Sequence, residues 1–484
     1  MNAVNASNGA LNELIENSCG GLSAWSTACI DAYLEYFHPH WPVIHSPTFD
    51  LDSDNLMLSA SVIMIGCWLE YPKADELVIA VHEKLVDNFL RELCNPGASL
   101  KQDSFGQIED YESMLLNVIF AYSSHREDLV ARATILLSLI ITALRQNGLL
   151  SSEMEAGREK AYKPDVFLPF VLSTREKRTS GQCQHLQIEE LDVSLPSTFS
   201  LWNTHGLDEF YKRHPQEPTT RVGIRLFNFL RHPELLDPLA WLVEDVHIGI
   251  CGMHWAVWRY NRTRQNGEVI EPNSKDQLEK QLDFWKVQLD RVAGLCDNVL
   301  LKFYLGSERK ESPSTLTRVH SLIHDTTLLY NITGLYLYSD VHVLPRSALN
   351  PVESAAEIRA STYSQEKNAQ IRQWALSIDG RKAVSFCIAV LEAQEKSLTR
   401  DKPGGRYVEP IAYAALLKCG AVLSAWFKAT KEFNSCRRAP NHTKLLSLED
   451  WINSGGSLAV GDDLLCTCRA DAWTRRFTVS LPTI

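Results

Sequence analysis

The sequence predicts an all-α protein, built as a single large multi-helical domain with two closely packed halves. Apolar residues recur at three- and four-residue steps through most of the chain, as amphipathic helices require. The sequence shows no strand-like alternation, repeat or low-complexity tract, and most candidate helices are joined by short linkers. Its 484 residues suffice for a large buried core. We expect a flexible N-terminus at 1–22, a first half at 23–205 and a helical second half at 206–484.

The charge balance argues against direct binding to nucleic acid. The chain has 48 Lys and Arg residues against 59 Asp and Glu residues, which gives a formal net charge of −11. Such a surface repels phosphate backbones unless a dense basic patch overcomes the repulsion. The densest basic runs, at 175–178 and 437–438, are too short for that role. We therefore predict that this chain does not bind nucleic acid itself.

Cysteine usage and the apolar runs indicate the compartment. Twelve cysteines are scattered along the chain without a Cys-x-x-Cys pair, which is typical of reduced, mostly buried thiols in an intracellular protein. The N-terminus has neither a basic nor an apolar targeting segment. Apolar runs such as 135–143 are shorter than the roughly 20 residues that a membrane span needs. The sequence thus predicts a soluble protein of the nucleus or cytoplasm that does not bind membranes.

Five helices are predicted in the first half. The first carries Trp25, Cys29 and Tyr33 along one side, and the second is almost wholly apolar, which favours a buried helix. The last two form a hairpin that ends at Asn-Gly, a pair typical of a left-handed helix cap. Arg145, in the final turn, is expected to act as a structural cap. The expected ranges are 23–37, 56–69, 75–93, 111–122 and 129–144.

The second half is predicted to be helical throughout, apart from one weak link. The stretch 340–370 is polar after Pro345 and Pro351, so it is expected to form a surface loop. The expected helices cover 235–264, 275–304, 315–338, 371–397 and 411–434.

The stretch 33–49 must change the direction of the chain. Its prolines bias the residues before them away from helix, and its aromatic side chains offer apolar surface that can anchor a turn in a core. We therefore predict a structural turn. Its three histidines, His38, His40 and His45, have few neighbouring carboxylates, so a turn-stabilising role is favoured over metal binding.

This turn resembles the opening of the fungal-specific transcription factor domain, an all-helical regulatory region that lies behind zinc DNA-binding modules in fungal regulators. The matching residues are Tyr33, Tyr36, Phe37, His38, Pro39, Pro42, Ile44, His45, Pro47, Thr48 and Phe49. Further segments that resemble the domain lie at 58–66, 115–117, 144–149, 189–202, 328–336 and 379–383. The chain departs from the family pattern at 179–189, where relatives usually insert one or more longer helices.

The resemblance implies a transcription-regulator-like protein. Only 37 residues precede His38, with two cysteines and no Lys or Arg, so we expect the chain to lack its own zinc module, unless that module is encoded upstream. Such a protein would act through protein partners, either a DNA-binding regulator or a second copy in a homodimer, in control of fungal metabolism, for example secondary metabolism. The alternative is a small-molecule-binding protein or a cofactor-free enzyme of a fungal metabolic pathway that reuses the regulatory fold.

No catalytic residue can be named from the sequence, and no cofactor is predicted. The chain lacks the nucleophile-elbow, P-loop, His-Glu-x-x-His and dinucleotide-binding glycine patterns. An enzyme of this kind would have to hold a reactive substrate in shape within an apolar cavity.

One helical stripe is the best candidate for a ligand-pocket face. It consists of His247, Cys251, His254 and Trp258. Their 4-3-4 steps put all four on one face of a helix. Three uses are open: an open zinc site, a packed polar stripe between helices, or one wall of an apolar cavity flanked by Trp255 and Tyr260. We expect the packed stripe and predict no metal.

Overall fold

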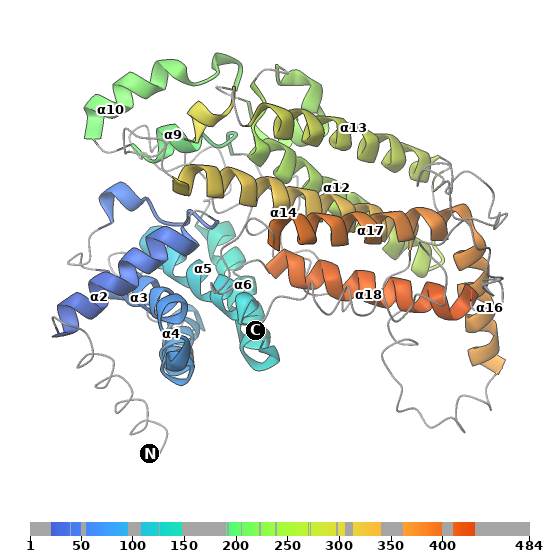
Figure 1. The fold of residues 1–484 in the computed structure, drawn as a ribbon, viewed down its shortest axis with the longest axis horizontal. Helices are drawn as coiled ribbons and strands as arrows, with labels where there is room; N and C mark the ends of the chain where they lie inside the picture. The colour runs from blue at the N-terminus through green and yellow to red at the C-terminus, as the bar shows by residue number, and fades with distance from the viewer. Residues whose placement is uncertain are drawn as a thin grey trace, which may run out of the picture.

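The computed structural model describes residues 21–38, 40–49, 55–94, 108–124, 126–147, 190, 193–204, 206–221, 224–237, 240–269, 271, 273–296, 299–304, 313–339, 362–398 and 410–430. These residues are predominantly helical and contain no β-strand, although an isolated antiparallel bridge joins Ser194 to Arg225. The predicted all-α class is therefore confirmed, with two groups of helices packed into one body (Figure 1). The division of the chain at residue 205 stays a prediction. The segment 179–189 and nearly all of the expected flexible N-terminus lie outside the described residues.

The first group of helices lies at the lower left of Figure 1. It comprises α2 (Gly21–Ala32), the π-helical turn η1 (Tyr33–Phe37), α3 (Leu56–Glu70), α4 (Asp75–Cys94), α5 (Ile108–Ser123) and α6 (Glu127–Gln146). α5 is the central helix, because it packs against α3, α4 and α6 and every residue from Tyr111 to Ser123 is buried. Local sequence explains where its neighbours begin: the Asn55 side chain caps α3 by accepting from the N–H of Leu58 (3.0 Å).

The helix predicted at 23–37 changes character after Ala32. Residues Tyr33–Phe37 form a π-helical turn, in which the N–H of His38 donates to the carbonyl oxygen of Tyr33 (2.9 Å). The rings of Tyr33 and Phe37 stack with centroids 5.2 Å apart, and both side chains are fully buried. The wider turn therefore ends the helix while it keeps both rings in the core.

The left-handed cap predicted at the end of α6 stays a prediction. Asn147 has a φ of −87°, outside the left-handed region, and Gly148 is not among the described residues. Arg145 reaches beyond the helix end, where its guanidinium donates two hydrogen bonds to the carboxylate of Glu190 (2.7 and 3.0 Å). Because both side chains are partly exposed, we expect this pair to contribute at most about 1 kcal/mol.

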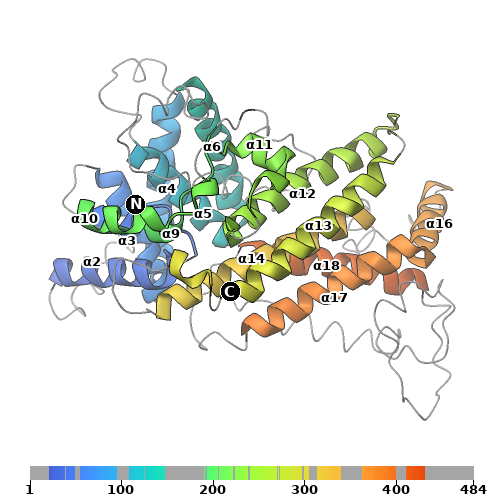
Figure 2. The same cartoon turned by 90° about the horizontal axis from the view of Figure 1, so that it is seen from above.

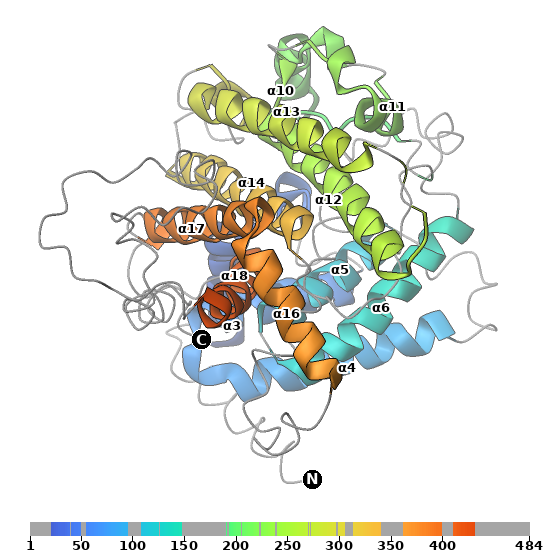
Figure 3. The same cartoon turned by 90° about the vertical axis from the view of Figure 1, so that its right-hand side faces the viewer.

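The second group is built around α14 (Pro313–Tyr338). Its other long helices are α12 (Val243–Gln265), α13 (Ser274–Leu295), α16 (Thr362–Leu376), α17 (Ile378–Leu398) and α18 (Pro410–Thr430). α14 packs against α12, α13, α17 and α18, and Figures 2 and 3 show it in the middle of this group. Shorter helices, α9 (Phe199–Trp202), α10 (Gly206–Arg213) and α11 (Leu226–Arg231), connect the two groups.

The helix predicted at 235–264 begins later than expected. Residues Pro233–Leu235 form a separate 3-10 turn, and the carboxylate of Asp245 accepts from the N–H of Leu242 (2.8 Å). This contact satisfies a free donor at the start of α12 and so fixes its first turn. At the other side of the group, the helix predicted at 275–304 ends earlier, at Leu295.

The helix predicted at 371–397 is two helices. α16 ends at Leu376, and at the break the Ser377 hydroxyl accepts from the N–H of Gly380 (3.2 Å), the second residue after the start of α17. α16 already begins at Thr362, inside the stretch 340–370 that was predicted to be a loop. The prediction of a loop from polar composition was therefore wrong for the part from Thr362 onward, which is a helix that packs against α17 and α18.

Among the residues that the structure describes, one helix has the length and composition of a membrane span. The window Ile411–Ala429 in α18 has a mean hydropathy of 1.3. It was not predicted from the sequence, because Lys418 and Lys428 interrupt its apolar residues. Of this window, 61% is buried inside the structure, where α18 packs against α14, α16 and α17. Burial in the core accounts for its apolar composition.

Candidate functional site

The predicted stripe on α12 faces α14. The Nδ1 atom of His247 lies 3.1 Å from Oγ1 of Thr326, and Nδ1 of His254 lies 3.1 Å from Oγ1 of Thr333. The two histidines are seven residues apart, and so are the two threonines, a spacing close to two helical turns. The two helices therefore run parallel and repeat the same His–Thr contact.

Burial determines the chemistry of the first contact. It lowers the pKa of His247 to about 4, because the charged imidazolium loses its hydration. The ring is therefore neutral at pH 7. Since the Thr326 hydroxyl donates to the carbonyl of Leu322 (2.6 Å), its oxygen is free to accept from the imidazole N–H. Cys251 is buried and Trp258 is half-buried on the same helix.

A pocket of about 450 Å³ lies against a different face of α14. None of the four stripe residues lines it. Its wall from α14 follows a 4-3-4 pattern of side chains: His320, His324, Thr327 and Asn331. Thr326 and Thr333, which face α12, do not line the pocket. The same helix therefore presents one face to a packed interface and another to an open space.

The other walls come from α13, α17 and the 33–49 turn. α13 contributes Lys286, Leu289, Asp290 and Ala293. α17 contributes Ala389, Glu392, Ala393, Lys396 and Ser397. One residue from the first half, His40, also lines the pocket. The volume falls in the usual range for sites of small molecules.

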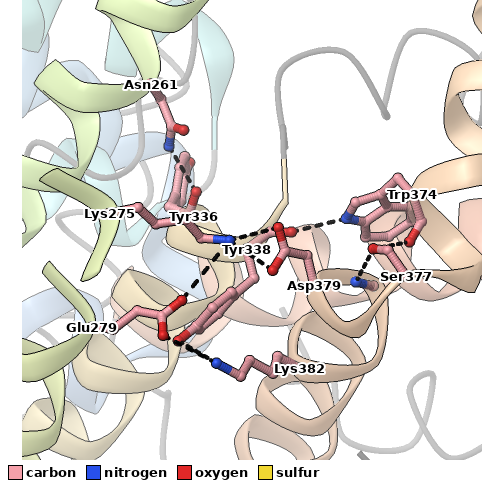
Figure 4. Close-up of polar contacts among 10 residues, drawn as sticks. Asn261, Lys275, Glu279, Tyr336, Tyr338, Trp374, Ser377, Asp379 and Lys382 are labelled. Atoms are coloured by element: carbon pink, nitrogen blue, oxygen red, sulfur yellow. Dashed lines mark hydrogen bonds and ion pairs between the residues drawn. The ribbon is translucent and has the colours of Figure 1, made fainter. Parts of the chain in front are cut away.

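A polar cluster at the far end of α14 fixes the register of these helices, as Figure 4 shows. The ammonium of Lys275, near the start of α13, lies 2.7 Å from both carboxylate oxygens of Asp379, near the start of α17. Lys382 of α17 donates to the hydroxyl of Tyr338, near the end of α14 (3.2 Å), and to Glu279 (3.3 Å). α13 and α17 are therefore parallel to each other, and α14 runs antiparallel to both.

This register places the histidines at one end of the pocket. His320 and His324, in the early turns of α14, lie level with the last turns of α17, where Lys396 and Ser397 are found. His40 joins them there, because its Nδ1 is hydrogen-bonded to the hydroxyl of Ser321 on α14. Three imidazoles from two distant parts of the chain thus meet at one end of the pocket.

Buried charges fix the start of α14 beside this end. Arg318 lies over the ring of Phe199 at 3.7 Å from its centroid and 3.6 Å from the carboxylate of Glu244. Glu244 also accepts from the hydroxyl of Tyr304 (2.7 Å). Burial raises the pKa of Glu244 and lowers that of Arg318, because each charge has lost hydration. These paired groups join the start of α14 to the start of α12 and to the connecting helix α9.

The other histidines of the turn bond within it. His38 Nε2 lies 3.0 Å from the carbonyl of Ile44, and His45 Nδ1 lies 2.7 Å from Oγ1 of Thr48. Both contacts suit the predicted turn-stabilising role. In the part of the chain that the structure describes, no three His, Cys, Asp or Glu side chains are placed to hold a metal ion.

Most of the residues that line this pocket were not predicted from the sequence. His320 and His324 belong to no motif, and their four-residue spacing is common on any helix face. The signal that could have been used is the small size of the α17 residues at the level of Thr327 and Asn331, where α17 has Ala393 and Ala389. Only knowledge of the helix register makes that signal usable.

Comparison with known proteins finds distant fungal relatives. The chain is 20% identical over 384 residues to the zinc finger protein klf1 of Schizosaccharomyces pombe, which covers 75% of this chain and 46% of that protein. It is 22% identical over 337 residues to the nicotinate catabolism cluster-specific transcription factor of Emericella nidulans, which covers 64% of this chain and 37% of the relative. No family model and no solved structure matches the chain.

These similarities support a general role in transcription regulation. The matched region spans less than half the length of either curated relative. The finer predictions from the sequence, namely the fungal-specific regulatory domain, the missing zinc module and the pathway, stay predictions.

Proposed function

We propose that this chain is a regulator of transcription in a fungus and acts through protein partners. The observation that carries the proposal is its distant similarity, over 75% of its length, to a fungal zinc finger protein, with a second match to a fungal transcription factor. The partner would be a DNA-binding regulator or a second copy of the chain, and the site of action the nucleus.

The charge of the chain favours action through a partner. A net charge of −11 opposes contact with a phosphate backbone. Two buried arginines, Arg318 and Arg221, form ion pairs within the fold, with Glu244 and Asp245, and so add nothing to a basic surface. A partner that carries the DNA contacts removes the need for a basic surface here.

A tethering assay tests this function. The full chain is fused to a heterologous DNA-binding domain, and transcription of a reporter with the matching operator is measured. We expect the reporter to change several-fold relative to the DNA-binding domain alone. A fusion that carries Phe37→Ala, which we expect to destabilise the fold strongly, is the matched control and should have less effect. An inert wild-type fusion, well expressed and folded, would contradict the proposal.

A polarisation titration with duplex DNA tests the partner step. At ~150 mM salt the isolated chain should show no sequence-dependent binding. Tight and sequence-dependent binding would mean that the chain contacts DNA by itself, and would remove the need for a DNA-binding partner.

A second candidate function, small-molecule binding, is favoured by the pocket beside α14. Its volume of about 450 Å³ suits a metabolite, and polar and apolar side chains both line it. The two functions are compatible, because a ligand that fastens the 33–49 turn to α14 could change the surface offered to a partner.

A further inference from the structure

We propose that the exposed face of α10 (Gly206–Arg213) is a dimer contact, and that it binds the same face of a second copy of this chain. This inference rests on the proposed action through protein partners and names one of those partners. α10 lies at the edge of the molecule in Figures 1 and 3, where a second molecule can reach it.

α10 is attached to the fold from one side only. None of its eight residues is buried, and its main contacts are with the neighbouring helix α9 and the 3-10 turn His214–Gln216. On the inner side, the guanidinium of Arg213 donates to the carbonyl oxygen of Ser200 in α9 (2.7 Å). This contact holds the helix in place and leaves its outer side to solvent.

Two large apolar side chains lie on the outer side of α10. Leu207 is 67% exposed and Tyr211 is 68% exposed, and their spacing of four residues puts them side by side on one face. The Tyr211 ring also makes an edge-to-face contact with Phe210, at 5.6 Å between ring centroids. Single exposed apolar residues are common. Two adjacent ones on a helix that adds little to the core form a small patch that a partner can cover.

The charges beside this patch identify the partner as a second copy. Each apolar residue is followed by a charged one, Asp208 toward the start of the helix and Lys212 toward its end. Consider two antiparallel α10 helices related by a two-fold axis at the middle of the helix. Leu207 of one copy then lies against Tyr211 of the other, and Asp208 lies opposite Lys212 twice. The face is therefore complementary to itself in apolar surface and in charge.

Both charged side chains can reach a partner. Asp208 is exposed and has no ion-pair partner among the residues that the structure describes. Lys212 is 61% exposed and bonds Glu209 (2.8 Å), a surface contact that it can exchange for another carboxylate. The apolar patch is small beside the roughly 1,600 Å² of a standard interface, so we expect a weak, reversible dimer with a Kd on the order of 100 μM.

The first test measures self-association of the full chain by sedimentation velocity, over a hundredfold range of concentration around this Kd. We expect the wild type to shift from monomer to dimer. Leu207→Ser combined with Tyr211→Ser should weaken the dimer at least tenfold. It should leave the melting temperature unchanged, because both side chains are exposed. Val287→Ser, at an exposed valine of α13, is the matched control and should keep the Kd within twofold of the wild type.

An exchange of charges tests the two-fold arrangement itself. Asp208→Lys and Lys212→Asp each place like charges opposite one another in a dimer of identical chains, so each should weaken association at least fivefold. A mixture of the two variants pairs opposite charges at both positions, and should associate within twofold of the wild type. The two variants shift the net charge in opposite directions, so a general charge effect cannot weaken both.

The outcomes separate the dimer from the underlying function. A chain that stays monomeric over the whole range would overturn the proposal, and so would a dimer that Leu207→Ser with Tyr211→Ser leaves unchanged. A mixture of the charge variants that associates no better than either alone would overturn the two-fold arrangement. If the chain is monomeric but the same double serine variant abolishes the reporter response in the tethering assay, the face binds a different protein. The dimer then fails and the regulatory function stands, whereas an inert wild-type fusion beside the expected dimer would contradict the regulatory function alone.

Discussion

Two central helices, α5 and α14, show how one helical pattern can give a sealed core or a pocket. α5 is buried on all sides from Tyr111 to Ser123. α14 is buried on all sides only in its last turns, from Leu328 to Tyr338, whereas the turns around His320 and His324 are half-buried and line the pocket.

The difference comes from the polar side chains on each helix. On α5, two small polar side chains are paired within the first group: Ser113 is hydrogen-bonded to Ser61 (2.9 Å), and Asn117 to both Ser61 (2.9 Å) and His82 (3.0 Å). Such pairs satisfy their hydrogen bonds at little volume, so neighbouring helices can close around them. On the pocket face of α14, Thr327 and Asn331 stand opposite two alanines of α17, and the helices leave space. Polar residues in the core of a helical protein therefore do not by themselves indicate a binding site. Small side chains on a facing helix, which leave space between the helices, are the better indication.

The largest effect should follow from Phe37→Ala at the junction of the two groups. Phe37 is fully buried and stacked on Tyr33, so its removal should cost about 3–5 kcal/mol of unfolding free energy. Urea unfolding followed by circular dichroism measures it. Tyr36→Ala, at the exposed neighbour, is the control and should stay within about 0.5 kcal/mol. An unchanged midpoint for Phe37→Ala would refute the structural role of the turn. Two separated transitions would show that the α5 and α14 groups unfold independently.

The next effect compares close helix contacts in the two groups. A Cβ at Gly66 on α3 would overlap the backbone carbonyl of Cys29, whereas a Cβ at Gly334 on α14 would meet only the ring end of Phe386. Backbone cannot move aside as a ring can, so Gly66→Ala should cost about 2–3 kcal/mol and Gly334→Ala about 1 kcal/mol. Gly294→Ala, where nothing lies within 4 Å, should stabilise α13 slightly. Equal costs for the first two changes would mean that both groups adapt equally well.

Much of the fold could be predicted from local sequence. Period-3.6 patterns located the buried helices α3 and α4 to within one residue at each end. A helix that buries one face or all of its faces has apolar residues at those positions, and the sequence shows them directly. The π turn at Tyr33–Phe37 and the break at Ser377 were not predicted, since both are set by packing between helices. The pocket joins side chains from four separate elements, and no spacing within one helix can reveal that.

The two faces of α14 can be compared by the same substitution at adjacent residues. Thr326→Val removes the oxygen that accepts from His247, which leaves a buried donor without a partner and should cost about 1–2 kcal/mol. Thr327 lines the pocket, and its hydroxyl bonds only one turn back, to Ile323 (2.7 Å). Thr327→Val should therefore be nearly neutral in urea unfolding. The reverse order would mean that the α12 interface, and not the pocket side, is the adaptable face.

The last comparison concerns pH, and it uses one histidine in each group. Burial lowers the pKa of His82 in the α5 group and of His247 in the α14 group to about 4, from an ordinary value of 6.5. Between pH 4 and 6.5 these two histidines are therefore protonated in the unfolded chain but largely neutral in the folded chain. Each histidine contributes its full stability above pH 6.5, and that contribution is lost as the pH falls toward 4, by at most about 1.4 kcal/mol per pH unit.

In the α14 group, a buried carboxyl group opposes this loss of stability at low pH. The pKa of Glu244, at the start of α12, is raised, so the folded state takes up a proton there more readily than the unfolded state and gains relative stability on acidification. We therefore measure the urea midpoint at pH 5 and pH 7 for the wild type, His82→Gln and His247→Gln. Each variant should lose part of the wild-type difference between the two pH values, and the double variant should lose both parts, because the residues lie in separate groups. If the His247 variant keeps the full pH difference, that imidazole is already hydrated in the folded protein, and the α12 face of α14 is as open as the pocket face.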